Sequence, residues 1–311
     1  MKYYESFREQ TNCYTVEGVL DYFNKRIRVD HYTGNVESII QTIDELAEKH
    51  SFTKCIIKGK GEHVSTWLSF GFLLEATIPH YFQGHDAYFF VKYNNDERRN
   101  SMHWTEEDTI LSGVKGKEIK EKVVPEKFLL RKATEEDAEE LATVFGKVFE
   151  VYPTPLNEAS YVLQTMKEDD TIYYVYEFEG EIISTASAEM NIKEGNAELT
   201  NCATLPEYRK HGFMKSLLIK LEEELREKSI FCSYTIARSL SFGMNAAFHQ
   251  LGYTYTGRLA NNCYIFDKLE DMNIWVKDLS SYSKAVKIPP QNSAVKQNSW
   301  VELGVRKSRT N

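Results

Sequence analysis

The stretch AELTNCATLPEYRKHGFMKSLL, residues 197–218, brings a carboxylate and a basic turn into one short segment. Glu198 lies in a run of strand-forming residues, and Arg209 and Lys210 precede Gly212, where an amphipathic helix is expected to begin. Unpaired N–H groups at a helix N-terminus attract anions, and a glycine lets a phosphate approach them. These residue types and spacings fit a phosphate-binding turn and a carboxylate that accepts a proton, and taken alone they fit equally a solubilising basic turn and an outward-facing strand glutamate.

The elements that must position these residues follow an α/β order. Apolar residues recur at helical spacing after Gly212, so the helix there is expected to bury one stripe against a sheet. Turn residues and alternating apolar residues mark the other elements. The pattern predicts a strand at 128–133, helices at 134–149 and 157–166, paired strands within 171–192, strands at 197–204 and 230–237, a helix at 241–252, and closing strands at 253–259 and 261–269.

Shifts in composition divide the chain into parts. Glycines, alternating lysine and glutamate, and Pro125 interrupt the apolar periodicity at 113–128, as is typical of a linker. The last segment is basic and is typical of a poorly ordered tail. We therefore expect an N-terminal α/β domain at 1–115, a linker at 116–127, a domain that carries the candidate site at 128–279, and a tail at 280–311.

Composition and charge disfavour several classes of protein. Of 311 residues, 42% are hydrophobic, which is enough for a sizeable core. No apolar run approaches the roughly 18 residues that span a membrane, and the N-terminus has no apolar signal segment, so a cytoplasmic protein is expected. The net charge of −8 disfavours nucleic acid and anionic membranes as partners. The five scattered cysteines argue against disulfides and structural zinc, so no metal is expected.

The motifs resemble those of the GNAT acetyltransferases. The pyrophosphate loop of that family has Arg or Gln, a glycine three positions later, and Gly or Ala two positions further on; Arg209 and Gly212 match it, and Met214 departs from it. The strand AELTNCAT resembles the family strand whose glutamate is the general base, a role that would fall to Glu198. NAAFHQLGY resembles the closing motif, with Phe248 in place of the usual general-acid tyrosine.

The resemblance implies acetyl-CoA as co-substrate and assigns the catalytic roles. Glu198 is implied as the base, and Glu189 as its substitute or as a group that binds the substrate ammonium. Tyr253 or Tyr264 would replace the missing acid, although the coenzyme thiolate can leave without strong acid help. A backbone N–H at a strand bulge near Cys202 is implied to stabilise the oxyanion, while the thiol itself is expected only to pack.

The same resemblance implies two sets of binding residues. The acceptor would be held by Tyr152, Glu189, Asn201 and Arg238, with the arginine on a substrate carboxylate. The coenzyme is expected to contact Cys202, Ala203, Thr204, Arg209, Lys210, His211, Gly212, Phe213, Met214, Lys215, Asn245 and Phe248.

A closer resemblance covers nearly the whole chain and points to the beta-lysine N-acetyltransferases. Its motifs are FEVYPTPL, CATLPEYRKHGFMKSLL, SFGMNAAFHQLGYTYTGRLANNC and DMNIWVKDL. It implies acetylation of the N6 amine of beta-lysine, a small-molecule product of lysine 2,3-aminomutase in lysine degradation, to give the compatible solute N6-acetyl-beta-lysine. Another acceptor, such as a polyamine, an amino acid or a protein lysine, stays open, as does a non-catalytic acyl-CoA sensor, which Met214 and Phe248 would favour.

The N-terminal region repeats the element order of the second half of the acetyltransferase domain. WLSFGFLLEATIPHYFQGHDAYFF parallels FHQLGYTYTGRLANNCYIF, but the turn DHYTGN lacks the arginine, so no coenzyme is expected there. We expect an α/β protein: a GNAT fold, with a mixed, mostly antiparallel sheet flanked by helices, after a smaller α/β domain. Two interpretations of that domain stay open: a degenerate half-GNAT that completes a sheet, covers the acceptor site or mediates homodimerisation, and a generic α/β appendage.

Overall fold

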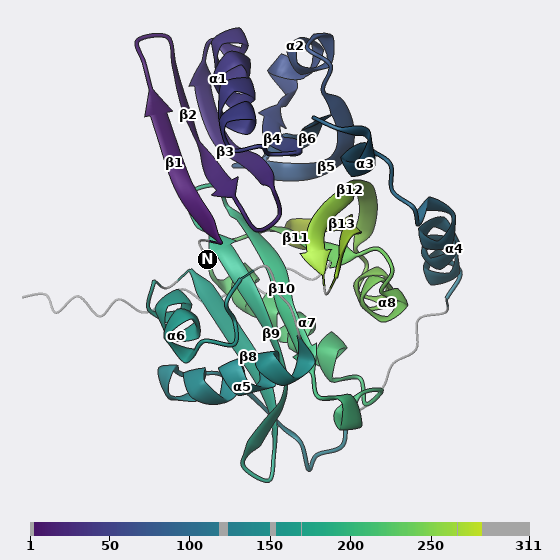
Figure 1. The fold of residues 1–311 in the computed structure, drawn as a ribbon. Helices are drawn as coiled ribbons and strands as arrows, with labels where there is room; N and C mark the ends of the chain where they lie inside the picture. The colour runs from purple at the N-terminus through teal and green to yellow at the C-terminus, as the bar shows by residue number, and fades with distance from the viewer. Residues whose placement is uncertain (1–2, 118–123, 150–153, 169, 266, 282–311) are drawn as a thin grey trace, which may run out of the picture. The chain divides into compact units, whose positions relative to one another are not determined.

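The computed structural model describes residues 3–117, 124–149, 154–168, 170–265 and 267–281. Its strands form one 13-stranded sheet in the order β1-β2-β3-β4-β6-β5-β12-β13-β11-β10-β9-β8-β7 (Figure 1). The strands are β1 (Tyr4–Gln10), β2 (Tyr14–Asp21), β3 (Arg26–Gly34), β4 (Lys54–Lys60), β5 (Leu73–Phe82), β6 (His85–Tyr93), β7 (Leu129–Lys132), β8 (Thr171–Phe178), β9 (Glu181–Asn191), β10 (Asn196–Thr204), β11 (Cys232–Arg238), β12 (Thr254–Ile265) and β13 (Lys268–Asp278).

The helices connect these strands and cover the sheet. They are α1 (Val36–Lys49), α2 (Val64–Ser69), α3 (Asp96–Arg99), α4 (Trp104–Lys115), α5 (Ala138–Val148), α6 (Ala159–Lys167), α7 (Phe213–Glu227) and α8 (Phe242–Gln250). Within the described residues, no helix is long and apolar enough to cross a membrane.

Strands β1 to β6 pair in the same pattern as strands β8 to β13. In both sets the first three strands form an antiparallel meander, the third and fourth are parallel, and the fourth pairs with the sixth. The connecting helices also correspond, because α1 and α7 follow the third strand and α2 and α8 follow the fourth. Two similar sheets therefore meet edge to edge, through β5 and β12.

The seam between β5 and β12 is one ladder pair, Gly257 with Ala76. A Cβ atom on Gly257 would lie 2.2 Å from the carbonyl oxygen of Glu75 and 2.5 Å from the Cα of Ala76. Any side chain would collide with backbone there, so the close approach of the two strands requires glycine.

We call the face of the sheet opposite α1 and α7 the inner face. Side chains alternate between the two faces along each strand, which shows the residues that lie on the inner face. On β8, Tyr174 bonds Glu224 of α7, whereas Tyr173 packs on Phe145 of α5 and so lies on the inner face. Figure 1 shows α5 and α6 on one side of strands β8 to β10. Ile27 of β3 is buried on the side of α1, so the residues directly before and after it in the strand lie on the inner face.

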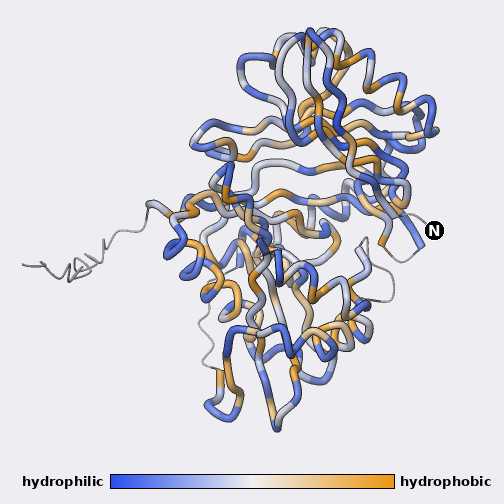
Figure 2. Tube along the Cα trace, turned by 90° about the vertical axis from the view of Figure 1, so that its left-hand side faces the viewer, coloured by the Kyte–Doolittle hydropathy of each residue, from blue (hydrophilic) through white to orange (hydrophobic). Residues whose placement is uncertain are grey.

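Three apolar clusters form the core. One lies between α1, α2 and the N-terminal strands, and another lies between helices α5 to α8 and the C-terminal strands. The third joins the halves on the inner face, where Ile78 and Phe89 pack with Tyr234 and Ile274. Hydrophobic segments run within the body of the sheet in Figure 2, and hydrophilic ones are common at the turns.

The fold class is as expected, and the closing strands are a correction. The sequence predicts strands at 253–259 and 261–269, but β12 runs without a break through this region and pairs with β13. The register of β12 with β13 shifts between Tyr255 and Gly257 and again between Leu259 and Cys263, so the two asparagines at 261 and 262 are accommodated within the strand. The edge strand β1 and helix α4 were not predicted. β1 alternates between exposed and half-buried residues, so its apolar signal is weak.

Candidate active site

Two carboxylates lie side by side on the inner face. Glu198 of β10 is the antiparallel ladder partner of Glu189 in β9 and the parallel partner of Tyr234 in β11. Burial raises the pKa of Glu198 to about 7, and the neighbouring Glu189 carboxylate adds to the effect. The positive charges of Lys58 and Arg28 oppose the rise. A carboxylate that titrates near neutral pH is suited to accept a proton from a substrate.

A β-bulge in β10 sits beside these carboxylates, where the resemblance implied one. The register with β9 shifts between Thr200 and Ala203, and Asn201 has a positive φ of 51°. Its Nδ2 donates to Ser187 Oγ at 2.9 Å and to Glu189 Oε1 at 3.1 Å, which fixes the second carboxylate. A bulge releases backbone groups from the ladder, so an N–H here can turn toward a ligand.

Cys202 lies within the same bulge and is chemically quiet. Burial raises the pKa of its thiol to about 12, so the thiol stays protonated at neutral pH. A nucleophilic cysteine needs a thiolate. The packing role expected from the sequence therefore agrees with its surroundings.

The start of α7 has the features of an anion site. Gly212 takes the N-cap position with φ 89°, and among the described residues no side chain caps the helix. By contrast, α1 is capped by Asn35, whose Oδ1 accepts from Ser38 N at 2.8 Å. Arg209 and Lys210 are exposed just before Gly212. The first-turn N–H groups of α7 thus face a basic turn, and the corresponding turn of α1 is closed by an amide.

The strand pair that leads to this turn separates early. β10 and β11 are parallel partners only from Asn196 to Glu198 within the described residues, although β10 continues to Thr204. Beyond the last pair, Phe213 is buried against Phe128 and Tyr176, and His211 stacks on Phe213 at 5.4 Å. The turn is therefore anchored by aromatic packing, and Met214 packs partly buried on the same core.

Several residues assigned by resemblance are used elsewhere in the fold. The Tyr253 hydroxyl bonds Ser233 Oγ at 2.7 Å, on the face of β11 opposite to Tyr234, so the structure does not bring it to Glu198. Phe248 is fully buried against Tyr253. Tyr264 packs edge-on against Phe23, and Tyr152 lies outside the described residues.

Arg238 is also engaged. Its Nε and Nη2 each donate at 2.8 Å to the carboxylate of Glu270 on β13. This bidentate pair occupies the fork that was expected to hold a substrate carboxylate.

Asn245, near the start of α8, connects this helix to neighbouring segments through side-chain hydrogen bonds. Its Nδ2 donates to the carbonyls of Arg238 and Ser241, and its Oδ1 accepts from Asn273 Nδ2 at 2.9 Å and Trp275 Nε1 at 2.8 Å. Both donor hydrogens and both lone pairs of the amide are therefore used inside the protein.

We predict that Asn245→Ala lowers the free energy of unfolding by about 2–4 kcal/mol, because buried donors on Asn273 and Trp275 lose their acceptor. Chemical denaturation followed by circular dichroism measures this loss, with Asn100→Ala, an exposed site, as control. Equal stability of the two variants would contradict the structural role.

The N-terminal half contributes residues to the inner face that motif comparison did not find. Lys58 of β4 donates to the Tyr81 hydroxyl at 2.8 Å, and the Tyr81 ring lies 5.6 Å from that of Tyr234. Burial raises the pKa of the Tyr161 hydroxyl of α6, and Tyr4 of β1 and Glu189 add to the effect. The available signal was charge within otherwise apolar strands, as in RIRVD and KCIIKGK.

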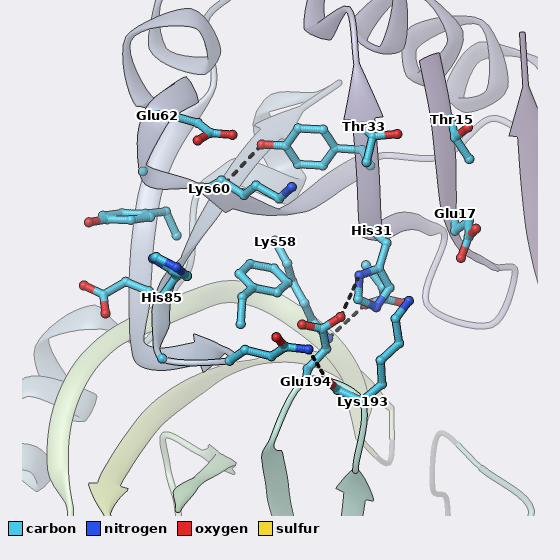
Figure 3. A pocket seen from close by; sticks show the side chains of 18 of the residues that line it. Thr15, Glu17, His31, Thr33, Lys58, Lys60, Glu62, His85, Lys193 and Glu194 are labelled. Carbon is cyan, nitrogen blue, oxygen red and sulfur yellow. Dashed lines mark hydrogen bonds and ion pairs between the residues drawn. The ribbon is translucent and has the colours of Figure 1, made fainter. Parts of the chain in front are cut away.

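A pocket of about 970 Å³ opens beside this surface (Figure 3). Its lining comes from the N-terminal strands and from the β9–β10 turn, where Lys193 and Glu194 lie. It contains none of the residues that the sequence assigned to the coenzyme or the acceptor, and it shares Asp30 and Lys58 with the inner face. The pocket therefore adjoins the candidate site without coinciding with it.

Parallel strands that separate next to a bulge and a helix that begins at a glycine are features that the resemblance implied for an acetyltransferase. Residues 134–253 match the family model described as Acetyltransferase (GNAT) family. The chain belongs to the GNAT acetyltransferase family.

Its curated relatives are similar over most of their length. It is 38% identical over 268 residues to N-acetyltransferase YodP of Bacillus subtilis, with coverage of 85% of this chain and 97% of that protein. It is 37% identical over 270 residues to beta-lysine N(6)-acetyltransferase of Methanosarcina mazei, with coverage of 80% and 99%. A solved ribosomal-protein-alanine N-acetyltransferase from Brucella melitensis is 21% identical, covers 48% of this chain and 99% of its own, and has a TM-score of 0.43.

Proposed function

We propose that the protein transfers the acetyl group of acetyl-CoA to the N6 amine of beta-lysine, giving N6-acetyl-beta-lysine, with Glu198 as general base. The placement of Glu198 carries the chemical part of this proposal, because its pKa of about 7 suits proton removal. The acceptor rests on two similar proteins that are named beta-lysine N(6)-acetyltransferase.

The coenzyme fits the residues around α7. Acetyl-CoA supplies the thioester, and the first-turn N–H groups of α7 with Arg209, Lys210 and Lys215 would hold its pyrophosphate. The uncapped N-terminus of α7 supports this placement. A backbone N–H of the β10 bulge would donate to the thioester oxygen as it gains negative charge.

Glu198 then removes the proton that prevents the acceptor amine from reacting. An alkyl ammonium has a pKa near 10.4 and cannot attack until it loses a proton, which Glu198 accepts. The thiol of the coenzyme has a pKa near 8.5, so the thiolate leaves without an acid residue. This accounts for a site in which Phe248 is buried and Tyr253 faces the other side of the sheet.

The test is a screen of acceptors with acetyl-CoA in which release of free thiol is followed. Beta-lysine is expected to give the highest kcat/KM among diamino acids, polyamines and lysine-containing peptides. A polyamine or peptide that reacts faster would contradict the proposed acceptor, and no thiol release with any amine would contradict the reaction.

We predict that Glu189→Gln raises the KM for beta-lysine by about 5- to 50-fold with a smaller change in kcat, because this carboxylate holds the substrate ammonium. Initial rates at varied beta-lysine measure both constants. Glu181→Gln, on the same strand and exposed, is the control. A large fall in kcat at unchanged KM would instead assign proton removal to Glu189.

A further inference from the structure

Arg28 of β3 lies on the inner face, with the catalytic carboxylates. Its neighbours Ile27 and Val29 are fully buried in the cluster beneath α1, so Arg28 projects from the opposite side of the strand. Glu189 and Glu198 occupy the same side of the C-terminal strands. The two halves thus place an arginine and two carboxylates on one face of the sheet.

A chain of contacts connects Arg28 to the base. The Arg28 Nε donates to Asp30 Oδ1 at 2.9 Å and Oδ2 at 3.1 Å, and Asp30 Oδ1 lies 2.9 Å from Lys58 Nζ. Lys58 bonds Tyr81, whose ring packs near Tyr234, the ladder partner of Glu198. Burial raises the pKa of both Glu189 and Glu198, and the charge of Arg28 opposes this rise, which agrees with the contacts.

The Arg28 guanidinium is hydrogen-bonded along one edge, and its other edge is available to a ligand. Within the described part of the chain, its hydrogen bonds all leave from Nε, and its side chain is 39% exposed. Asp30 is itself fixed by the β3 bulge, because the β2–β3 register shifts at this residue. A guanidinium fixed through Nε presents its two terminal nitrogens as a fork, the geometry that binds a carboxylate with two hydrogen bonds.

We propose that Arg28 binds the carboxylate of the acceptor and that Asp30 is its positioning residue, so that the N-terminal half selects amino acids over plain amines. The inference rests on the proposed function. Lys58 cannot take this role in the same way, because its ammonium already bonds both Asp30 and Tyr81. Arg238, the earlier candidate, is paired with Glu270.

The experiment compares two acceptors in steady-state kinetics of the full chain: beta-lysine, and 1,4-diaminopentane, which has the same carbon skeleton without the carboxylate. For Arg28→Ala we expect the preference for beta-lysine over the diamine, measured as the ratio of their kcat/KM values, to fall about 10- to 100-fold, mainly through the KM for beta-lysine. Arg28→Lys keeps the charge but loses the fork, so a smaller loss confined to beta-lysine is expected. Arg99→Ala, an exposed arginine of the same half, is the control.

The outcomes separate this inference from the proposed function. A parent enzyme that does not acetylate beta-lysine contradicts the proposed function itself. A parent that does so, with Arg28→Ala equally active on beta-lysine or equally impaired on both acceptors, overturns only the role of Arg28. If Arg28→Ala does not melt cooperatively, the same comparison in Arg28→Lys decides, and an unchanged preference for beta-lysine overturns the inference.

Discussion

Glu198→Gln is expected to lower kcat by about two to four orders of magnitude at neutral pH, because the amide keeps the shape of the side chain but cannot accept the ammonium proton. Coenzyme affinity should not change. The parent rate should fall as pH drops through about 7, where Glu198 becomes protonated. Toward pH 10 more of the acceptor is already neutral, so the loss caused by the substitution should shrink.

Rates from pH 6 to 10 measure this difference, with saturating beta-lysine and acetyl-CoA. Glu207→Gln, an exposed glutamate just beyond β10, is the matched control. Near-parental turnover of Glu198→Gln at neutral pH, together with a large loss in Glu189→Gln, would reverse the roles of the two carboxylates.

Gly212→Glu is expected to weaken acetyl-CoA binding by about 100-fold or more, because it places a negative charge where the pyrophosphate is expected. The helix should survive, since an acidic residue is favourable at a helix N-terminus, although the positive φ of 89° adds about 1 kcal/mol of strain. Titration calorimetry with acetyl-CoA measures the affinity.

Gly180→Glu is the control that distinguishes the effect of backbone strain from the effect of a charge placed at the start of α7. Gly180 also has a positive φ, of 86°, and a Cβ there meets nothing within 4 Å, but it lies in the turn between β8 and β9. It should bind the coenzyme like the parent. If both variants bind acetyl-CoA normally, α7 does not hold the pyrophosphate.

Local motifs anticipated the surroundings of Glu198 because that information is contiguous in sequence. Strand, bulge, glycine turn and helix all fall within residues 197–218, and the structure has each of them. The closing motif was less informative. Asn245 fits the family pattern by position, yet its amide is satisfied by Asn273 and Trp275 on β13, which no local pattern could pair with it.

The contribution of the N-terminal half could not be predicted without knowing the order of the strands in the sheet. Arg28 and Glu198 are far apart in sequence, and they share a face only because β5 and β12 join two sheets of the same topology. Charged residues alternating with apolar ones in β3 and β4 were visible, but an exposed strand would show the same pattern. The partner strands had to be known before those charges could be assigned to the inner face.

The different caps on α1 and α7 have a consequence for stoichiometry. The chain carries the strand pattern of an acetyltransferase half twice, but Asn35 closes one helix opening and Gly212 leaves the other open. The described residues therefore offer the proposed coenzyme site once per chain. Under the proposal above, its counterpart would supply Arg28 and Asp30 instead, so that one copy of the repeated architecture would bind the acetyl donor and the other the carboxylate of the acceptor.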